Sequence, residues 1–169
     1  MKKFLLSAVA VFVAVSVANA DPKFGVVGYT GQSSISGIAV PNGVGAFITD
    51  DMYSAGLTVG VASATKPDSA KKSVTGIGLE GKYKVAFDSM TAGTVGIRYL
   101  LASGKTGESS GVDTKFKTTY QLSLTAGIER QLTSNLILVA DIDVFTSTSG
   151  KLEAGSAESE FADSTILGG

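Results

Sequence analysis

The stretch YSAGLTVGVASAT, residues 53–65, shows most clearly the alternation of apolar and small residues that indicates the fold. From Tyr53 to Val61 every second residue is apolar, and the residues between them are only Ser, Gly and Thr. Because successive side chains of a β-strand point to opposite faces, this strand has one oily face and one small, uncharged face. A sheet in water normally carries charged side chains on the face away from its core. The pattern therefore favours a strand with lipid on one side and a narrow, packed interior on the other.

The same alternation recurs along the chain and predicts eight strands. The expected strands cover residues 23–31, 37–48, 53–65, 73–86, 91–102, 118–131, 136–145 and 160–169. In the second of them, Pro41-Asn42-Gly43 interrupts the pattern. Pro and Gly inside a strand usually mark a bulge, so we expect a bulge there.

The connections between these strands are of two kinds. Short polar turns are expected after the second, fourth and sixth strands, at residues 49–52, 87–90 and 132–135, and longer charged loops after the third, fifth and seventh, at 66–72, 103–117 and 146–159. Another short polar turn, at 32–36, is expected between the first two strands. Short turns at one end and long loops at the other are typical of outer-membrane barrels, whose short turns face the periplasm. The sequence thus predicts an all-β fold, a closed antiparallel up-and-down transmembrane β-barrel of eight strands.

The first twenty residues predict a cleaved secretory signal. Lys2 and Lys3 precede an apolar run from Phe4 to Val17, and Ala18-Asn19-Ala20 fits the small-x-small cleavage rule. A retained anchor helix is the alternative, but the run is shorter than the roughly 20 residues that span a bilayer. We expect a signal peptide at 1–20 and one barrel domain at 21–169. Later apolar runs are also too short for a spanning helix.

Charged residues test the assignment of the faces. Arg or Lys at mid-depth on a lipid-facing surface costs roughly 2–4 kcal/mol, so charges within strands should point inward. Arg130 is outward in this scheme, but it lies at the rim, where a long side chain can reach water. The expected inward charges form a polar network in the lumen: Glu80, Lys82, Lys84, Arg98, Glu129, Asp141 and Asp143.

A hairpin centred on Ser89 sets the register of the strands on either side. It places Glu80 opposite Arg98, and Leu79 opposite Tyr99. Buried charges need partners, so we predict a Glu80–Arg98 ion pair in the lumen. The network has two interpretations: a polar plug that holds the barrel closed, or part of a path for ions or a ligand. Asp141 and Asp143 could also hold a cation or do acid–base work, as an alternative to packing in the lumen.

Four tyrosines are expected to mark the membrane interfaces. Tyr53 and Tyr83 lie next to short turns, and Tyr99 and Tyr120 lie toward the long loops. Because Tyr is enriched at both boundaries of a bilayer, the two pairs predict two aromatic girdles.

The signal segment, the alternating strands, and the turns TDDM before YSAGLTVGV and LTSN before LILVADIDV together resemble the small eight-stranded outer-membrane β-barrel family. That family includes the OmpA transmembrane domain and OmpX. Its members end on an aromatic residue, whereas this sequence stops at Leu167-Gly168-Gly169. Either the sequence is truncated there or the eighth strand is assigned wrongly.

The resemblance implies a bacterial outer-membrane location. The implied partners are membrane lipid, lipopolysaccharide and, during biogenesis, the insertion machinery. It also implies a monomeric, non-enzymatic protein whose surface loops act in envelope integrity, adhesion or contact with a host. The alternatives are a narrow porin-like channel or small-ligand carrier and, less favoured, a soluble periplasmic lipocalin-like barrel.

Composition argues against other classes of function. The chain has 14 basic and 15 acidic residues, so no nucleic-acid partner is indicated. Without Cys or His it offers neither a disulfide framework nor a usual transition-metal site. A Ser nucleophile would lack a His base, and the glycines form no nucleotide-binding motif. We expect no enzymatic activity and no cofactor.

Overall fold

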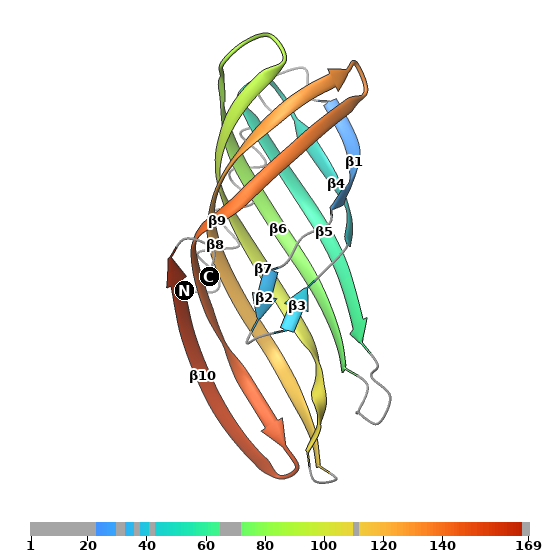
Figure 1. Ribbon diagram of the computed structural model, residues 1–169, viewed down its shortest axis with the longest axis vertical. Coiled ribbons are helices and arrows are strands. Elements are labelled where there is room, and N and C mark those ends of the chain that lie inside the picture. The colour runs from blue at the N-terminus through green and yellow to red at the C-terminus, as the bar shows by residue number, and fades with distance from the viewer. Residues whose placement is uncertain are drawn as a thin grey trace.

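The computed structural model describes residues 23–29, 33–35, 38–40, 43–64, 72–109 and 112–166, and it is built from β-strands (Figure 1). Eight of them form one sheet in the order β1-β4-β5-β6-β7-β8-β9-β10, and each strand is antiparallel to its neighbours in the sheet. Its strands are β1 (Lys23–Tyr29), β4 (Gly43–Thr49), β5 (Tyr53–Ala64), β6 (Lys72–Ala86), β7 (Thr91–Ser109), β8 (Val112–Thr133), β9 (Leu136–Ala154) and β10 (Ala157–Ile166). The predicted all-β, up-and-down arrangement is confirmed.

Some sequence predictions fall outside the described residues. These are the signal peptide at 1–20, the residues Pro41-Asn42, the connection at 65–71 and the end of the chain at 167–169. Among the described residues there is no helix long and apolar enough to cross a bilayer.

The expected second strand is in fact two strands in different sheets. Residues of β3 (Ile38–Val40) pair with β2 (Ser33–Ile35) in a separate two-stranded sheet, and β4 joins the main sheet. The prediction of a polar turn at 32–36 is therefore wrong, as is that of one bulged strand over 37–48. Because proline has no N–H to donate to a ladder, a single continuous strand through position 41 is unfavourable.

Two of the expected long loops are mostly strand. β7 continues to Ser109 and β8 begins at Val112, while β9 continues to Ala154 and is joined to β10 by a turn at Gly155-Ser156. Gly155 has φ 61°, a conformation that costs glycine little. The Ser, Thr, Gly and charged residues of these segments suggested loops. Solvent-exposed hairpin strands, however, have a similar composition. The prediction of loops at 103–117 and 146–159 is wrong for that reason.

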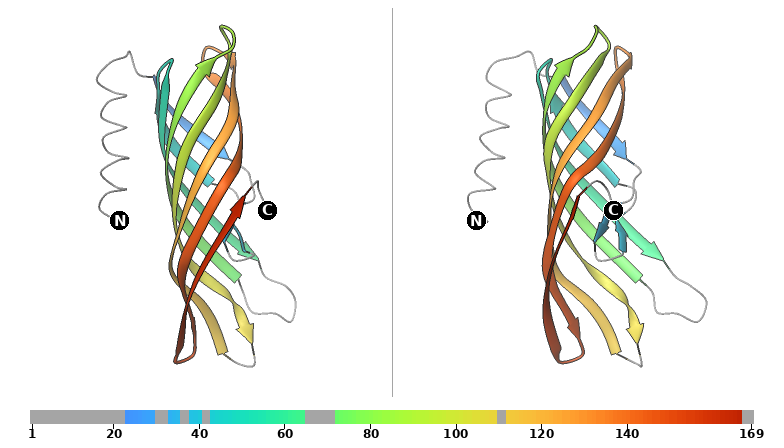
Figure 2. Two further views of the ribbon diagram at one scale, coloured as in Figure 1. Left: turned by 90° about the vertical axis from the view of Figure 1, so that its left-hand side faces the viewer. Right: turned by 60° about the vertical axis from the view of Figure 1, so that its left-hand side comes forward.

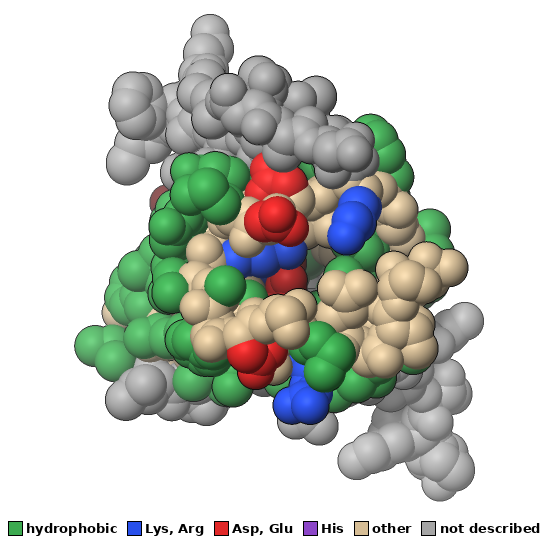
Figure 3. Space-filling model, turned by 90° about the horizontal axis from the view of Figure 1, so that it is seen from above, with side chains coloured by type: hydrophobic (Ala, Val, Ile, Leu, Met, Phe, Trp, Pro, Cys, Tyr) green, Lys and Arg blue, Asp and Glu red, His purple; other side chains and the backbone are tan. Residues whose placement is uncertain are grey.

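The sheet is polar inside and apolar outside. Along β6, Ile77, Tyr83 and Val85 are exposed, whereas Lys82 and Lys84 between them are buried. Over the described residues only four hydrophobic side chains are buried, against eleven polar or charged ones. We call the face that carries Lys82 and Lys84 the inner face. Seen end-on, charged side chains gather in the middle of the molecule and hydrophobic ones lie around them (Figure 3).

A bulge in β9 exchanges the faces of its second half. Asp143 lies opposite Thr125 and Phe145 opposite Leu124, so Val144 between them has no partner in β8. The extra residue shifts the alternation by one position. As a result Thr148 is buried on the inner face and Ser149 is exposed.

The curled sheet is not closed (Figures 1 and 2). β1 and β10 are its two edges, and no pairing between these two strands exists within the described ranges. β10 pairs only with Phe145–Ala154, the second half of β9. Closure of the barrel, which the sequence predicts, is therefore not present in this structure.

In each of two short turns, an aspartate carboxylate accepts hydrogen bonds from two backbone N–H groups. Asp50 Oδ1 accepts the backbone N–H groups of Met52 and Tyr53, each at 2.6 Å. Asp88 Oδ1 accepts those of Met90 and Thr91, each at 2.7 Å. The hydrogen bond from Met90, followed by that from Thr91, holds the pKa of the Asp88 carboxyl below its usual value. These turns fix the registers of the β4–β5 and β6–β7 hairpins.

The bulge at Val144 makes a prediction that can be tested with single cysteines in this cysteine-free chain. Ser149→Cys should react with a thiol reagent in the folded protein, because Ser149 lies on the exposed face. Thr148→Cys should be protected, because Thr148 is 7% exposed. Mass spectrometry of the labelled, folded protein measures both. Reversed reactivity would mean that the alternation continues unshifted from Ile142.

Candidate functional site

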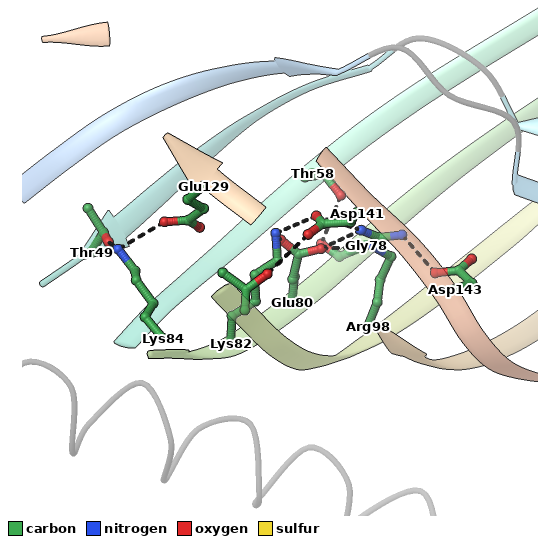
Figure 4. Close-up of polar contacts among 11 residues, drawn as sticks. Thr49, Thr58, Gly78, Glu80, Lys82, Lys84, Arg98, Glu129, Asp141 and Asp143 are labelled. Atoms are coloured by element: carbon green, nitrogen blue, oxygen red, sulfur yellow. Dashed lines mark hydrogen bonds and ion pairs between the residues drawn. The ribbon is translucent and has the colours of Figure 1, made fainter. Parts of the chain in front are cut away.

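The seven charged residues expected in the lumen lie together on the inner face (Figure 4). Three of them alternate along β6, and the others come from β7, β8 and β9. The register of the β6–β7 hairpin places Glu80 opposite Arg98 and Leu79 opposite Tyr99, as predicted. The Glu80–Arg98 ion pair is present. Arg98 Nε lies 2.8 Å and Arg98 Nη2 lies 2.7 Å from Glu80 Oε2.

Five of the residues form one continuous group, which we call the Arg98 cluster: Glu80, Lys82, Arg98, Asp141 and Asp143. Lys82 Nζ lies 2.6 Å from Asp141 Oδ2 and 2.9 Å from Glu80 Oε1. Arg98 Nη1 donates a hydrogen bond to Asp143 Oδ1 at 3.1 Å, and Arg98 Nη2 lies 3.6 Å from Asp141 Oδ2. Two cations thus face three carboxylates, which leaves one negative charge in excess.

A second, smaller group lies nearer the short turns. Lys84 Nζ is 3.0 Å from Glu129 Oε2 and also donates a hydrogen bond to Thr49 Oγ1. The Lys84 and Glu129 side chains are both largely buried. Thr49 was missed by sequence reasoning, which assigned it to a turn. It is the last residue of β4, and its alternation with Gly45 and Phe47 is the signal that could have found it.

Several of these contacts cross the sheet rather than follow it. Lys82 is on β6 and Asp141 on β9, so their ion pair passes over β7 and β8. Three strand spacings of about 4.8 Å would separate them by about 14 Å in a flat sheet, too far for strong contact of side chains that stand perpendicular to it. The ion pair requires a strongly curled sheet, and it stabilises the curl.

Two glycines leave room for the cluster. A Cβ added to Gly96 would lie 2.8 Å from Lys82 Cγ, and one added to Gly127 would overlap the Asp141 carboxylate. Gly127 lies directly opposite Asp141 in the ladder. The sequence analysis assigned these glycines no role in the ion pairs.

The four tyrosines form two pairs. Tyr53 lies opposite Tyr83, with ring centroids 5.5 Å apart. Tyr99 and Tyr120 stack with centroids 6.3 Å apart. The first pair lies toward the short turns and the second is further along the strands, toward the long hairpins. Their residues are on the outer face, opposite the Arg98 cluster.

The ends of the long hairpins carry exposed ion pairs. Lys117 Nζ lies 3.1 Å from Glu153 Oε2, and Lys151 Nζ lies 3.2 Å from Glu160 Oε1. Such exposed pairs contribute about 0–1 kcal/mol each. They mark a part of the sheet whose outer face is charged.

Within the Arg98 cluster the carboxylates and the two cations neutralise one another's charges. Each of its carboxylates lies against Lys82, Arg98 or both, and Thr94 Oγ1 donates a further hydrogen bond to Asp141 at 3.4 Å. In the described part of the chain no group of three or more His, Cys, Asp or Glu side chains is arranged to hold a metal ion.

No family model, curated protein or solved structure matches this chain.

Removing one member of the cluster tests its contribution to stability. Asp141→Asn should lower the free energy of unfolding by about 3 kcal/mol, because it leaves the nearly buried Lys82 with one carboxylate fewer. Glu153→Gln, in an exposed pair, is the matched control and should change it by less than about 1 kcal/mol. Urea unfolding of the refolded protein, followed by tyrosine fluorescence, measures both. Equal effects of the two substitutions would contradict this role.

Proposed function

We propose that this chain is a non-enzymatic β-barrel protein of the bacterial outer membrane, exported by a cleaved signal at 1–20 and inserted by the outer-membrane insertion machinery. The observation that carries the proposal is the inverted distribution of polarity. Lys82, Lys84 and Glu129 are buried, while Leu57, Ile97 and Ile142 are about half exposed or more. In water that arrangement forgoes the hydrophobic driving force of folding, whereas in a bilayer it is the favourable one.

The apolar band on the outer face has the height of a bilayer core. On β8 it runs from Tyr120 to Arg130, which at about 3.3 Å per residue is about 33 Å along the strand. At a tilt of about 40° this corresponds to about 25 Å along the barrel axis, the height of the lipid-facing band of outer-membrane barrels. Leu124 and Ile128 within it are exposed. The two tyrosine pairs, one toward the short turns and one toward the long hairpins, would form the aromatic girdles.

The proposed native form is a closed, monomeric eight-stranded barrel with the Arg98 cluster in its lumen. An eight-stranded barrel is just wide enough for its own side chains. Contacts between strands far apart in the sheet, such as Lys82–Asp141, support that interpretation because they already hold the sheet in a tight curl.

The long hairpins would carry the function. β7–β8 and β9–β10 extend past the apolar band, and their outer faces carry Lys105, Lys117, Lys151 and Glu153. Charged strands beyond the band would lie among lipopolysaccharide head groups and in the medium. Contact with the envelope or with surfaces outside the cell is the role that such hairpins fit.

A narrow channel is the second candidate. The observation in its favour is the 30% exposure of the Arg98 side chain, the highest in the cluster. The paired charges oppose it, because they occupy the inner face where a pore would run. A stable conductance in planar lipid bilayers would favour the channel over the plug.

A charge placed in the apolar band tests the membrane location. Ile97→Lys should lower the free energy of unfolding in lipid vesicles by roughly 2–4 kcal/mol, because Ile97 is exposed in the middle of the band. Ser103→Lys, on the same strand and face but outside the band, is the matched control and should have little effect. Urea titration of the vesicle-inserted protein measures both. Recovery of the wild-type protein in the soluble fraction without detergent would overturn the proposal.

A further inference from the structure

The outer face of the β7–β8 hairpin brings two lysines directly opposite each other. Lys105 of β7 pairs with Lys115 of β8 in the antiparallel ladder, and both side chains are exposed. Side chains that are opposite in such a ladder share a face, with Cβ atoms about 4.5–5.5 Å apart. Because like charges at this separation repel, the pair weakens the hairpin unless an anion lies against both ammonium groups.

The carboxylate next to this pair is engaged by another lysine. Lys115 lies opposite Glu153 of β9, but Lys117 Nζ lies 3.1 Å from Glu153 Oε2. Among the side chains that the structure describes, no carboxylate lies within ion-pair distance of Lys115. The protein itself therefore supplies Lys115 with little of the negative charge that would offset the repulsion.

The charges of this face are distributed unevenly across the strands. On the β6 side, Lys105 lies opposite Ser73, which offers a hydroxyl group and no charge. The carboxylates of the face whose side chains are described lie on β9 and β10, and they are Glu153, Glu158 and Glu160. An anion that approaches the face is therefore attracted to the part over β6, β7 and β8.

The position of the lysine pair along the strands matches the level of lipid head groups. Lys105 is four residues beyond Leu101, which lies opposite Tyr120 at the border of the apolar band. At about 3.3 Å per residue and a tilt of about 40°, the pair lies about 10 Å beyond the band. The polar layer starts directly outside the hydrocarbon and is about 5–7 Å thick on each side of a bilayer. A lysine side chain can bend along its strand, so both ammonium groups can reach this layer.

We propose that Lys105 and Lys115, with Ser73 beside them, bind a phosphate monoester on the head group of a membrane lipid. A phosphate monoester carries a charge of about −1.5 to −2 at pH 7 and has three acceptor oxygens, which suits two ammonium groups and a hydroxyl. A phosphodiester carries a single charge and offsets the repulsion less. The inference deepens the proposed function and rests on it, because a lipid reaches the pair only if the apolar band lies in a bilayer.

The experiment uses the full chain in phosphatidylcholine vesicles, with a single Trp in this Trp-free sequence. Leu101→Trp places the indole on the outer face, between the apolar band and the lysine pair. Quenching by lipids that carry bromine on their acyl chains then measures which lipid lies beside the site. Phosphatidic acid, a monoester, should associate several times more strongly than phosphatidylglycerol, a phosphodiester. Equal association of the two lipids overturns the proposal.

Substitutions in the Leu101→Trp background assign the preference to the lysine pair. Lys115→Gln should lower the association of phosphatidic acid about fivefold, the effect of one Lys near an anionic membrane surface. Lys105→Gln should act in the same way. Lys151→Gln is the matched control, because it removes the same charge from the same face but lies in a pair with Glu160. Equal effects of Lys115→Gln and Lys151→Gln would show general surface attraction and overturn the site.

Two further outcomes separate the source of the phosphate and the membrane location. Inorganic phosphate at the concentration of the phosphatidic acid should leave the preference unchanged, because it lacks acyl chains to hold it beside the sheet. Loss of the preference would assign the pair to free phosphate and overturn the proposal. Absence of quenching by brominated phosphatidylcholine would contradict the proposed function, and this inference with it. Equal quenching by all three lipids would contradict this inference alone.

Discussion

The ion pair between Lys82 and Asp141 is the interaction on which the shape of the sheet depends. It joins β6 to β9 over two intervening strands, with 2.6 Å between Nζ and Oδ2. Removing two charges from water costs several kcal/mol, so such a pair persists only where geometry and additional hydrogen bonds are good. Glu80, Arg98 and Thr94 supply these additional contacts. The sheet curls around this group, and its small inner residues allow the curl.

The curl explains why the two faces differ so strongly. Once the inner face wraps around paired charges, little space remains for large apolar side chains, and Ser, Thr and Gly occupy most of it. The outer face then carries nearly all the large apolar residues. Because a lipid environment would satisfy both faces, the cluster supports the proposed location.

Local features of this fold could be predicted from the sequence, and those that depend on distant contacts could not. The Glu80–Arg98 pair follows from a short turn about Ser89, because a tight hairpin fixes its own register. The Lys82–Asp141 pair depends on the curvature of four strands, which alternation does not encode. The bulge at Val144 lies in a run without Gly or Pro, so nothing local signals it. The long hairpins were predicted as loops because solvent-exposed hairpins and loops contain similar polar residues.

Along its strands the sheet has two regions that differ in their outer faces. Near the short turns the sheet is apolar outside and charged inside. Toward the long hairpins its outer face becomes charged, with Lys117 and Lys151 in exposed ion pairs. In the proposed membrane form, the first region would lie in the bilayer and the second in water.

The central claim is that the outer face meets lipid and the inner face does not. Spin labels on single cysteines along β7, from Val95 to Leu101 in lipid vesicles, test it most directly. Labels at Val95, Ile97, Tyr99 and Leu101 should be accessible to oxygen dissolved in the bilayer, and a label at Leu100, which lies on the inner face outside the Arg98 cluster, should be protected from it. Oxygen accessibility without a two-residue period, or with the opposite phase, would contradict the account.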